Sequence, residues 1–154
     1  MKMNNIVFNT TFEMSIRLLL ALSLLQNKKI TIDGLVTADF IANYSKEFGI
    51  SDNNLHGDNE FSFFEFSIRR TLGQKAIREL VLEDLAKVSC TKKGFIYSIT
   101  NRGRELCNKL TSDYAVKYKV NVNNAIAYMN SKTEKEILNL ISKEASKSLW
   151  REER

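Results

Sequence analysis

The feature that most restricts the fold of this chain is one β-hairpin pattern in a sequence that is otherwise spaced mainly like helices. Residues 85–91 and 95–99 alternate apolar and polar side chains as two short strands, and Lys92-Lys93-Gly94 separates them as a turn. Long stretches on either side repeat their apolar residues with the helical period. The sequence therefore predicts a mainly α fold with a small β-hairpin, in the α+β class.

A cationic helix is predicted directly before the hairpin, from Phe64 onward. Apolar residues recur at four-residue steps and are expected to face inward: Ile68, Leu72, Ala76 and Leu80. Arg70, Gln74 and Arg78 have the same spacing on the opposite face. These residue types can read guanine and adenine in a major groove, although a solvated helix face is the simpler explanation. Gly73 lies inside the helix and indicates either a break or a close backbone approach.

Further cations follow this helix. Lys92 and Lys93 at the hairpin tip are placed to contact backbone phosphate. Thr100 is expected to cap a helix after the hairpin, and Arg102 and Arg104 lie in its first turn, where cations oppose the helix dipole and favour an anionic partner. The candidate set for binding nucleic acid or a partner is Arg70, Gln74, Arg78, Lys92, Lys93, Arg102 and Arg104.

Charge is spread unevenly along the chain. The net charge is +5, yet residues 31–65 contain seven acidic residues and one lysine, whereas residues 69–104 contain nine cations and three acidic residues. The basic segment suits a polyanion such as double-stranded DNA, or an acidic protein. Alternatively, the two segments face and neutralise each other within the fold.

The N-terminal part is predicted to supply the core. Thr10 and Glu13 form a capping-box pattern at the start of a helix that continues to Gln26. Its run IRLLLALSLL is apolar on almost every side, so the helix is central or has a second face for a partner. The run is too short for a bilayer and Arg17 interrupts it, so no membrane segment is expected and the chain is predicted to be cytoplasmic.

Shorter patterns complete the chain. Residues 28–32 are predicted as an edge strand, and Asp33 as the N-cap of a second helix that reaches Tyr44. Residues 49–60 lack periodicity and are expected to form a loop. The tail is predicted to be helical, with a second capping box at Ser131-Lys132-Thr133-Glu134.

No catalytic site, cofactor site or metal site is predicted, and an enzyme is not expected. His56 is the only histidine, and no glycine-rich phosphate loop, nucleophile elbow or paired-carboxylate motif is present. Cys90 and Cys107 fall where inward apolar residues are expected, and their spacing is not that of a metal knuckle. Four aromatic residues near the cationic helix are expected to pack, with base stacking as the alternative: Phe61, Phe63, Phe64 and Phe66.

The predicted order of elements, helix–strand–helix–helix–hairpin–helix, resembles winged-helix domains. The phrase GFIYSITNRGRELCNKL, residues 94–110, is similar to the wing and following helix of many bacterial members. This resemblance implies a winged helix-turn-helix domain over residues 1–111. Residues 112–154 would then be a C-terminal helical extension that packs on the domain or on a partner.

A narrower resemblance covers residues 8–129. FNTTFEMSIRLLLALSLL, ITIDGLVTADFIANYSKEFGIS, NLHGDNEFSFFEFSIRR and SDYAVKYK are similar to the middle component of bacterial ABC-three-component systems, in which a small winged-helix protein accompanies a large ABC-type ATPase. The family pattern often has proline where Thr11 stands. The resemblance implies a non-enzymatic adaptor or sensor beside the ATPase in a conflict or defence system. It also implies a docking element, formed by Asn9, Thr10, Phe12 and Glu13.

Two other functions compete with this hypothesis. The first is an autonomous winged-helix transcriptional regulator that binds double-stranded DNA, for which a homodimer is expected. The second, and weakest, is a small enzyme that uses the loop at residues 49–60.

Overall fold

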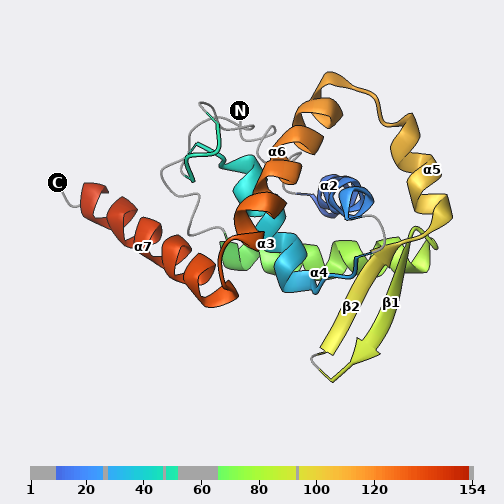
Figure 1. The fold of residues 1–154 in the computed structure, drawn as a ribbon, viewed down its shortest axis with the longest axis horizontal. Helices are drawn as coiled ribbons and strands as arrows, with labels where there is room; N and C mark the ends of the chain where they lie inside the picture. The colour runs from blue at the N-terminus through green and yellow to red at the C-terminus, as the bar shows by residue number, and fades with distance from the viewer. Residues whose placement is uncertain (1–9, 26–27, 47, 52–65, 93, 153–154) are drawn as a thin grey trace.

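The fold is helical apart from one hairpin (Figure 1). The computed structural model describes residues 10–25, 28–46, 48–51, 66–92 and 94–152. Its elements, in chain order, are α2 (Thr11–Leu24), α3 (Ile32–Asn43), α4 (Phe66–Leu82), β1 (Ala86–Thr91), β2 (Gly94–Ile99), α5 (Asn101–Lys109), α6 (Asp113–Asn130) and α7 (Glu134–Glu152). For the described residues, the prediction of a mainly helical chain with one antiparallel hairpin is confirmed.

Helix α2 is the centre of the core. Figure 1 shows it end-on and surrounded by other elements, and it contacts α3, α4, α5, α6 and β2. The hydroxyl of Thr10 caps it by accepting a hydrogen bond from the backbone N–H of Glu13 at 3.2 Å. Apolar residues on all sides of the helix are buried: Met14, Leu18, Leu19, Leu20, Ala21 and Leu22. The predicted start and central position of this helix are confirmed, and it ends slightly earlier than predicted.

Helix α3 begins before its predicted cap. Thr31 is the N-cap, and its hydroxyl accepts a hydrogen bond from the Gly34 N–H at 3.1 Å. The prediction of Asp33 was wrong because the threonine hydroxyl two residues earlier takes this role. The edge strand predicted here is reduced to one bridge, in which Ile30 and Tyr97 exchange backbone hydrogen bonds of 3.0 and 2.8 Å.

Helix α4 is continuous through Gly73. A Cβ atom at this position would lie 2.4 Å from Cγ2 of Val36 on α3, so the glycine marks a close approach of two helices and not a break. The predicted inward position of Ile68 was wrong, because its side chain is 63% exposed and the neighbouring Arg69 is buried instead. The buried face near the start of α4 contains Arg69 and Gly73. Each lies one position after a residue of the predicted apolar pattern, so the inward face is displaced by one residue there.

The hairpin and the helix after it follow their predicted pattern. β1 and β2 are paired along their full length, and the hairpin projects away from the helices (Figure 1). Thr100 caps α5 by accepting a hydrogen bond from the Gly103 N–H at 3.0 Å, as predicted. Cys107 is buried as predicted. The inward prediction for Cys90 was wrong, because this residue lies on the projecting part of β1 and is exposed.

Helices α6 and α7 form the C-terminal part of the chain. α6 packs on α2 and α3, and Tyr118, Val122 and Ala125 on its inner face are fully buried. α7 extends to one side (Figure 1), and the hydroxyl of Thr133 before it accepts a hydrogen bond from the Glu136 N–H at 3.1 Å. The predicted capping box was therefore two residues too early. No helix in the described ranges is long and apolar enough to cross a membrane.

Candidate partner-binding site

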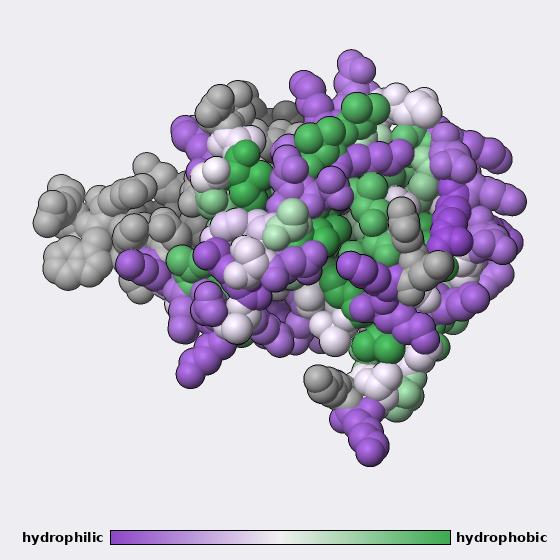
Figure 2. Space-filling model, viewed as in Figure 1, coloured by the Kyte–Doolittle hydropathy of each residue, from purple (hydrophilic) through white to green (hydrophobic). Residues whose placement is uncertain are grey.

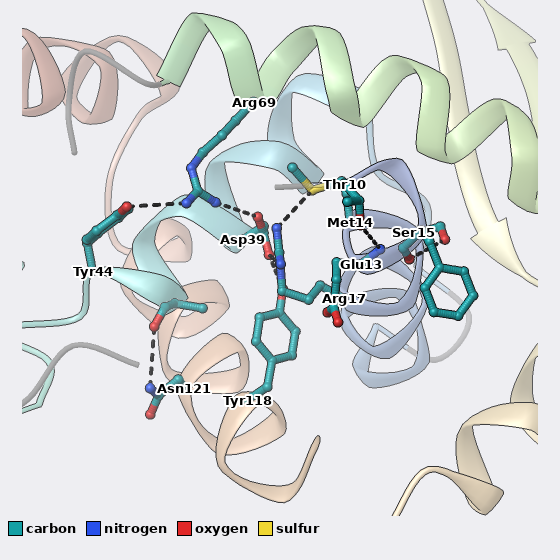
Figure 3. A network of polar contacts seen from close by, with 12 residues as sticks. Thr10, Glu13, Met14, Ser15, Arg17, Asp39, Tyr44, Arg69, Tyr118 and Asn121 are labelled. Atoms are coloured by element: carbon teal, nitrogen blue, oxygen red, sulfur yellow. Dashed lines mark hydrogen bonds and ion pairs between the residues drawn. The ribbon is translucent and has the colours of Figure 1, made fainter. Parts of the chain in front are cut away.

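A buried ion cluster joins four helices at the centre of the molecule (Figure 3). Nε of Arg17 on α2 donates a hydrogen bond to Oδ1 of Asp39 on α3 at 2.9 Å, and the hydroxyl of Tyr118 on α6 donates to the same oxygen at 2.6 Å. Nη1 of Arg69 on α4 lies 3.5 Å from Asp39 Oδ2. Nη2 of Arg69 donates to the hydroxyl of Tyr44 at 3.2 Å, and this guanidinium also stands 5.3 Å from the tyrosine ring centroid. The cluster is a structural link between helices.

The charge states in the cluster follow from its surroundings. Burial alone would raise the pKa of the Asp39 carboxyl, but the guanidinium groups of Arg17 and Arg69 hold it below its ordinary value. Burial raises the pKa of the Tyr118 phenol well above its ordinary value, and the adjacent Asp39 carboxylate raises it further. Burial also raises the pKa of Tyr114, to about 12. Two guanidinium groups, one carboxylate and a neutral phenol therefore coexist in the core.

The sequence contains one signal that could have predicted this cluster. Arg17 and Asp39 are each a single charge within a mostly apolar helical run. Charged side chains are buried only when they are paired, so two isolated charges of opposite sign indicate a pair. No local pattern distinguishes Arg69 from Arg70, because both offer the same charge at adjacent positions.

Arg70, the first residue of the predicted binding stripe, is held by a carboxylate of the same chain. Its Nε and Nη2 donate to the two carboxylate oxygens of Asp33 on α3, each at 3.0 Å. The two side chains are 47% and 45% exposed. A guanine contact by Arg70 would require this two-pronged ion pair to break first.

A groove of about 580 Å³ lies between the start of α2, the C-terminal half of α4 and α5. Its apolar lining comes from all three helices and the segment before β1: Phe12, Ile16, Leu19, Leu80, Leu85 and Leu106. Charged residues of both signs line it from α4 and from the residue directly after its end: Lys75, Arg78, Glu79 and Glu83. Phe12 is 72% exposed, so an aromatic ring stands open to solvent beside an apolar hollow.

The groove brings together residues from two predicted sets. Arg78, from the basic stripe, and Phe12, from the predicted docking element, both line it. Thr10 and Glu13 form the N-terminal cap of α2, next to the groove. Asn9 lies outside the described residues. Glu79 and Glu83 were not foreseen as parts of a site. Glu79 is on α4 and Glu83 directly follows its end, four positions later, and their carboxylates bring negative charge to a face that was predicted to be basic.

The remaining predicted binding residues lie on other elements. Gln74 is exposed on α4, and Lys92 is exposed at the hairpin tip, whereas Lys93 lies outside the described residues. Arg102 is exposed and Arg104 is half-buried in the first turn of α5. The structure thus divides the predicted cationic set between α4, the projecting hairpin and α5.

Other candidate sites lie partly outside the described residues. Among the residues that the structure describes, no group of three or more histidine, cysteine, aspartate or glutamate side chains could hold a metal ion. His56 and three of the four clustered phenylalanines lie outside those residues. The fourth, Phe66, packs edge-on against Phe40 with ring centroids 5.1 Å apart, as expected for a core aromatic.

Comparison with protein families gives a match over most of the chain. The family model described as ABC-three component (ABC-3C) system Middle Component 2 matches residues 7–151, and so includes α7, which lay outside the resemblance in the sequence. No curated protein and no solved structure matches the chain. Because the match covers nearly the whole sequence, the chain belongs to the Middle Component 2 family of ABC-three component systems.

Proposed function

We propose that this chain is a non-enzymatic, winged-helix adaptor subunit that docks on the ABC-type ATPase of its system through the groove between α2 and α4. Membership of a three-component system implies protein partners. The winged-helix assignment is supported by the order of elements and by the Ile30–Tyr97 bridge, which places a strand position between the first two helices beside the hairpin.

The observation that carries the proposal is the exposed Phe12 at the apolar groove. Protein interfaces combine an apolar centre with a polar rim, and their anchors are often aromatic side chains that enter a pocket. The groove has this composition, with Phe12 beside apolar residues of α4 and α5 and four charged side chains nearby. Burial of such an exposed aromatic ring against another chain would stabilise the complex.

The charges at the groove favour a protein over nucleic acid. Arg78 stands in the same lining as Glu79 and Glu83, whose carboxylates would repel phosphate groups. Arg70 is already paired with Asp33. A protein surface can match both signs of charge, whereas a DNA backbone offers only one.

Binding to the purified ATPase component tests the proposal. We expect Phe12→Ala to weaken the complex by about tenfold or more, as for truncation of an interface anchor. Arg78→Glu should weaken it as well, because it reverses one charge of the groove. Val120→Ala on α6 is the matched control, since it truncates another exposed apolar side chain and should leave the affinity unchanged. Equal binding by all three variants would exclude the groove as the docking site.

A second candidate function is that of an autonomous, dimeric DNA-binding regulator. It is favoured by the exposure of Gln74, Arg78 and Lys92, whose side chains suit base and phosphate contacts. Titration of duplex DNA over a salt series tests it, because several phosphate contacts produce a steep fall of log affinity with log salt. Absence of binding at low salt would exclude this function.

A further inference from the structure

The hairpin stands away from the helices as a separate surface. Figure 1 shows β1 and β2 projecting from the end of α4, and Figure 2 shows the same projection with hydrophilic atoms at its far end. Its base is anchored in the core by Ala86 and Ile99, which are buried opposite one another. A two-stranded hairpin without further support is marginally stable in water, so the projecting half is a candidate for a contact with another chain.

One face of the hairpin is apolar along its whole length. Because side chains alternate along a strand, the pairs Val88–Tyr97 and Cys90–Phe95 lie on the same face as the buried pair at the base. Exposure increases toward the tip, and reaches 44% for Val88 and 60% for Phe95. A hairpin that contacted only phosphate groups would not require this apolar face.

Within the described residues, the outer edge of β1 has no other strand beside it. Tyr97 directs its backbone N–H and C=O away from β1, because both bond to Ile30. Its cross-strand partner Val88 must then direct its own backbone groups away from β2, as must Cys90 two residues further on. In the described part of the chain β1 pairs with β2 alone.

Charge indicates what kind of strand would fit this edge. Residues 86–99 contain Lys87, Lys92 and Lys93 and no acidic residue. A second copy of the hairpin would bring like charges together, so self-pairing through this edge is disfavoured. An extended segment with apolar residues on one face and acidic residues near the lysines complements both the edge and the charge.

We propose that β1 accepts a β-strand from the ATPase component of the same system, and that this strand is apolar on the face of Val88 and Phe95 and acidic toward the hairpin lysines. The identity of the partner rests on the proposed function, but the surface is separate from the groove. Backbone hydrogen bonds along β1 would supply affinity, and the apolar face would select the register.

Hydrogen exchange of the full chain, free and with the purified ATPase component, tests the inference directly. The amides of Val88 and Cys90 point outward, so their exchange should slow by about tenfold or more in the complex. The Ser89 amide, which faces β2 in the same strand, is the internal reference for the hairpin itself. Unchanged exchange at Val88 and Cys90 in a formed complex would overturn the proposal.

Variants provide a second, independent readout. Phe95→Thr keeps a residue suited to a strand but removes an exposed ring, and should weaken binding to the ATPase component by about tenfold. Val88→Pro removes an outward N–H without removing a β1–β2 hydrogen bond, and should weaken binding more than Val88→Ala. Val116→Thr, on the exposed surface of α6, is the matched control.

The outcomes separate the two proposals. A complex that is sensitive to Phe12→Ala but not to Phe95→Thr or Val88→Pro would retain the adaptor function and refute strand addition. No complex with the ATPase component would refute both. Protection of Val88 and Cys90 by duplex DNA, with no protection by the ATPase component, would assign the hairpin to nucleic acid and also refute strand addition.

Discussion

Arg69 and Arg70 are neighbours on α4, and each pairs with an aspartate of α3, but they occupy opposite environments. Arg69 reaches inward to Asp39, in a cluster that is closed to solvent and shared with Arg17 and Tyr118. Arg70 reaches outward to Asp33, and both of these side chains are nearly half exposed. The same two residue types, between the same two helices, therefore form one pair inside the protein and one pair at its surface.

This comparison separates the geometry of an ion pair from its contribution to stability. The outer pair has the better geometry, with two hydrogen bonds of 3.0 Å, whereas the inner contact of Arg69 is 3.5 Å long. Yet exposed pairs contribute about 0–1 kcal/mol, and removal of one partner from a buried pair costs about 3–5 kcal/mol. Burial, and not the distance between charged atoms, should decide which pair the fold depends on.

The largest effect is expected from Asp39→Ala. This change leaves two guanidinium groups in the core without their carboxylate, and should lower the free energy of unfolding by about 3–5 kcal/mol. Urea denaturation followed by circular dichroism measures it. Asp33→Ala is the matched control on the same helix and should cost less than about 1 kcal/mol. Similar losses for the two variants would break the distinction between the inner and outer pairs.

A smaller loss is expected from Tyr118→Phe. It removes the 2.6 Å hydrogen bond to Asp39 but keeps the ring, and should cost about 1–3 kcal/mol. The raised pKa of Tyr118 also predicts that stability is lost as the pH rises above about 10, where the unfolded chain ionises and the folded chain does not. Unfolding experiments from pH 8 to about 11 should show a shallower alkaline decline for the variant. An unchanged decline would mean that the phenol of Tyr118 is not the responsible group.

Acid should lower the stability of the fold by weakening the inner ion pair. Because the folded pKa of Asp39 is lowered, its stabilisation is fully present above the ordinary aspartate pKa near 4 and is lost as the pH falls below it toward the folded value. Denaturation of the wild type between about pH 5 and pH 2 measures this loss, at up to about 1.4 kcal/mol for each pH unit. Asp39→Asn should have a flatter acid profile, and an equally steep one would contradict the assignment.

The smallest effect is expected at the outer pair. A double-mutant cycle with Arg70→Ala and Asp33→Ala should give a coupling energy of about 0–1 kcal/mol at low salt. In about 1 M salt the coupling should fall close to zero, because exposed charges are screened. A large coupling energy that does not depend on salt would show that the outer pair behaves like a buried one. That result would contradict the distinction between the inner and outer pairs.

Much of the fold was predictable because its signals are local. The apolar run of α2, the alternating hairpin and the caps at Thr10 and Thr100 each depend on residues only a few positions apart. Errors arose where two local solutions compete. Thr31 and Asp33 are both suitable N-cap residues for α3. Before α7, a serine and a threonine two residues after it each stand three positions before a glutamate, which is the spacing of a capping box. Only the path of the preceding chain decides between them.

The candidate sites were harder to predict because they depend on contacts between distant segments. Arg17 and Asp39 are bonded across 22 positions, and a pattern of apolar spacing assigns a charged residue such as Arg69 to the outer face by default. Phe12 and Arg78 were placed in separate sets, and only the packing of α2 on α4 brings them to one groove. The sequence could name these residues one by one, but their grouping required the tertiary structure.

The buried cluster also limits how this sequence can diverge. Arg17, Asp39, Arg69 and Tyr118 lie on four helices, and losing one of them leaves a charge or a polar group unmatched in the core. Replacement of a whole buried ion cluster by apolar residues can be neutral, although each single step toward it is costly. We therefore expect these four positions to change together among descendants of one ancestor, or not at all, and an alignment of the family would reveal them as a covarying set.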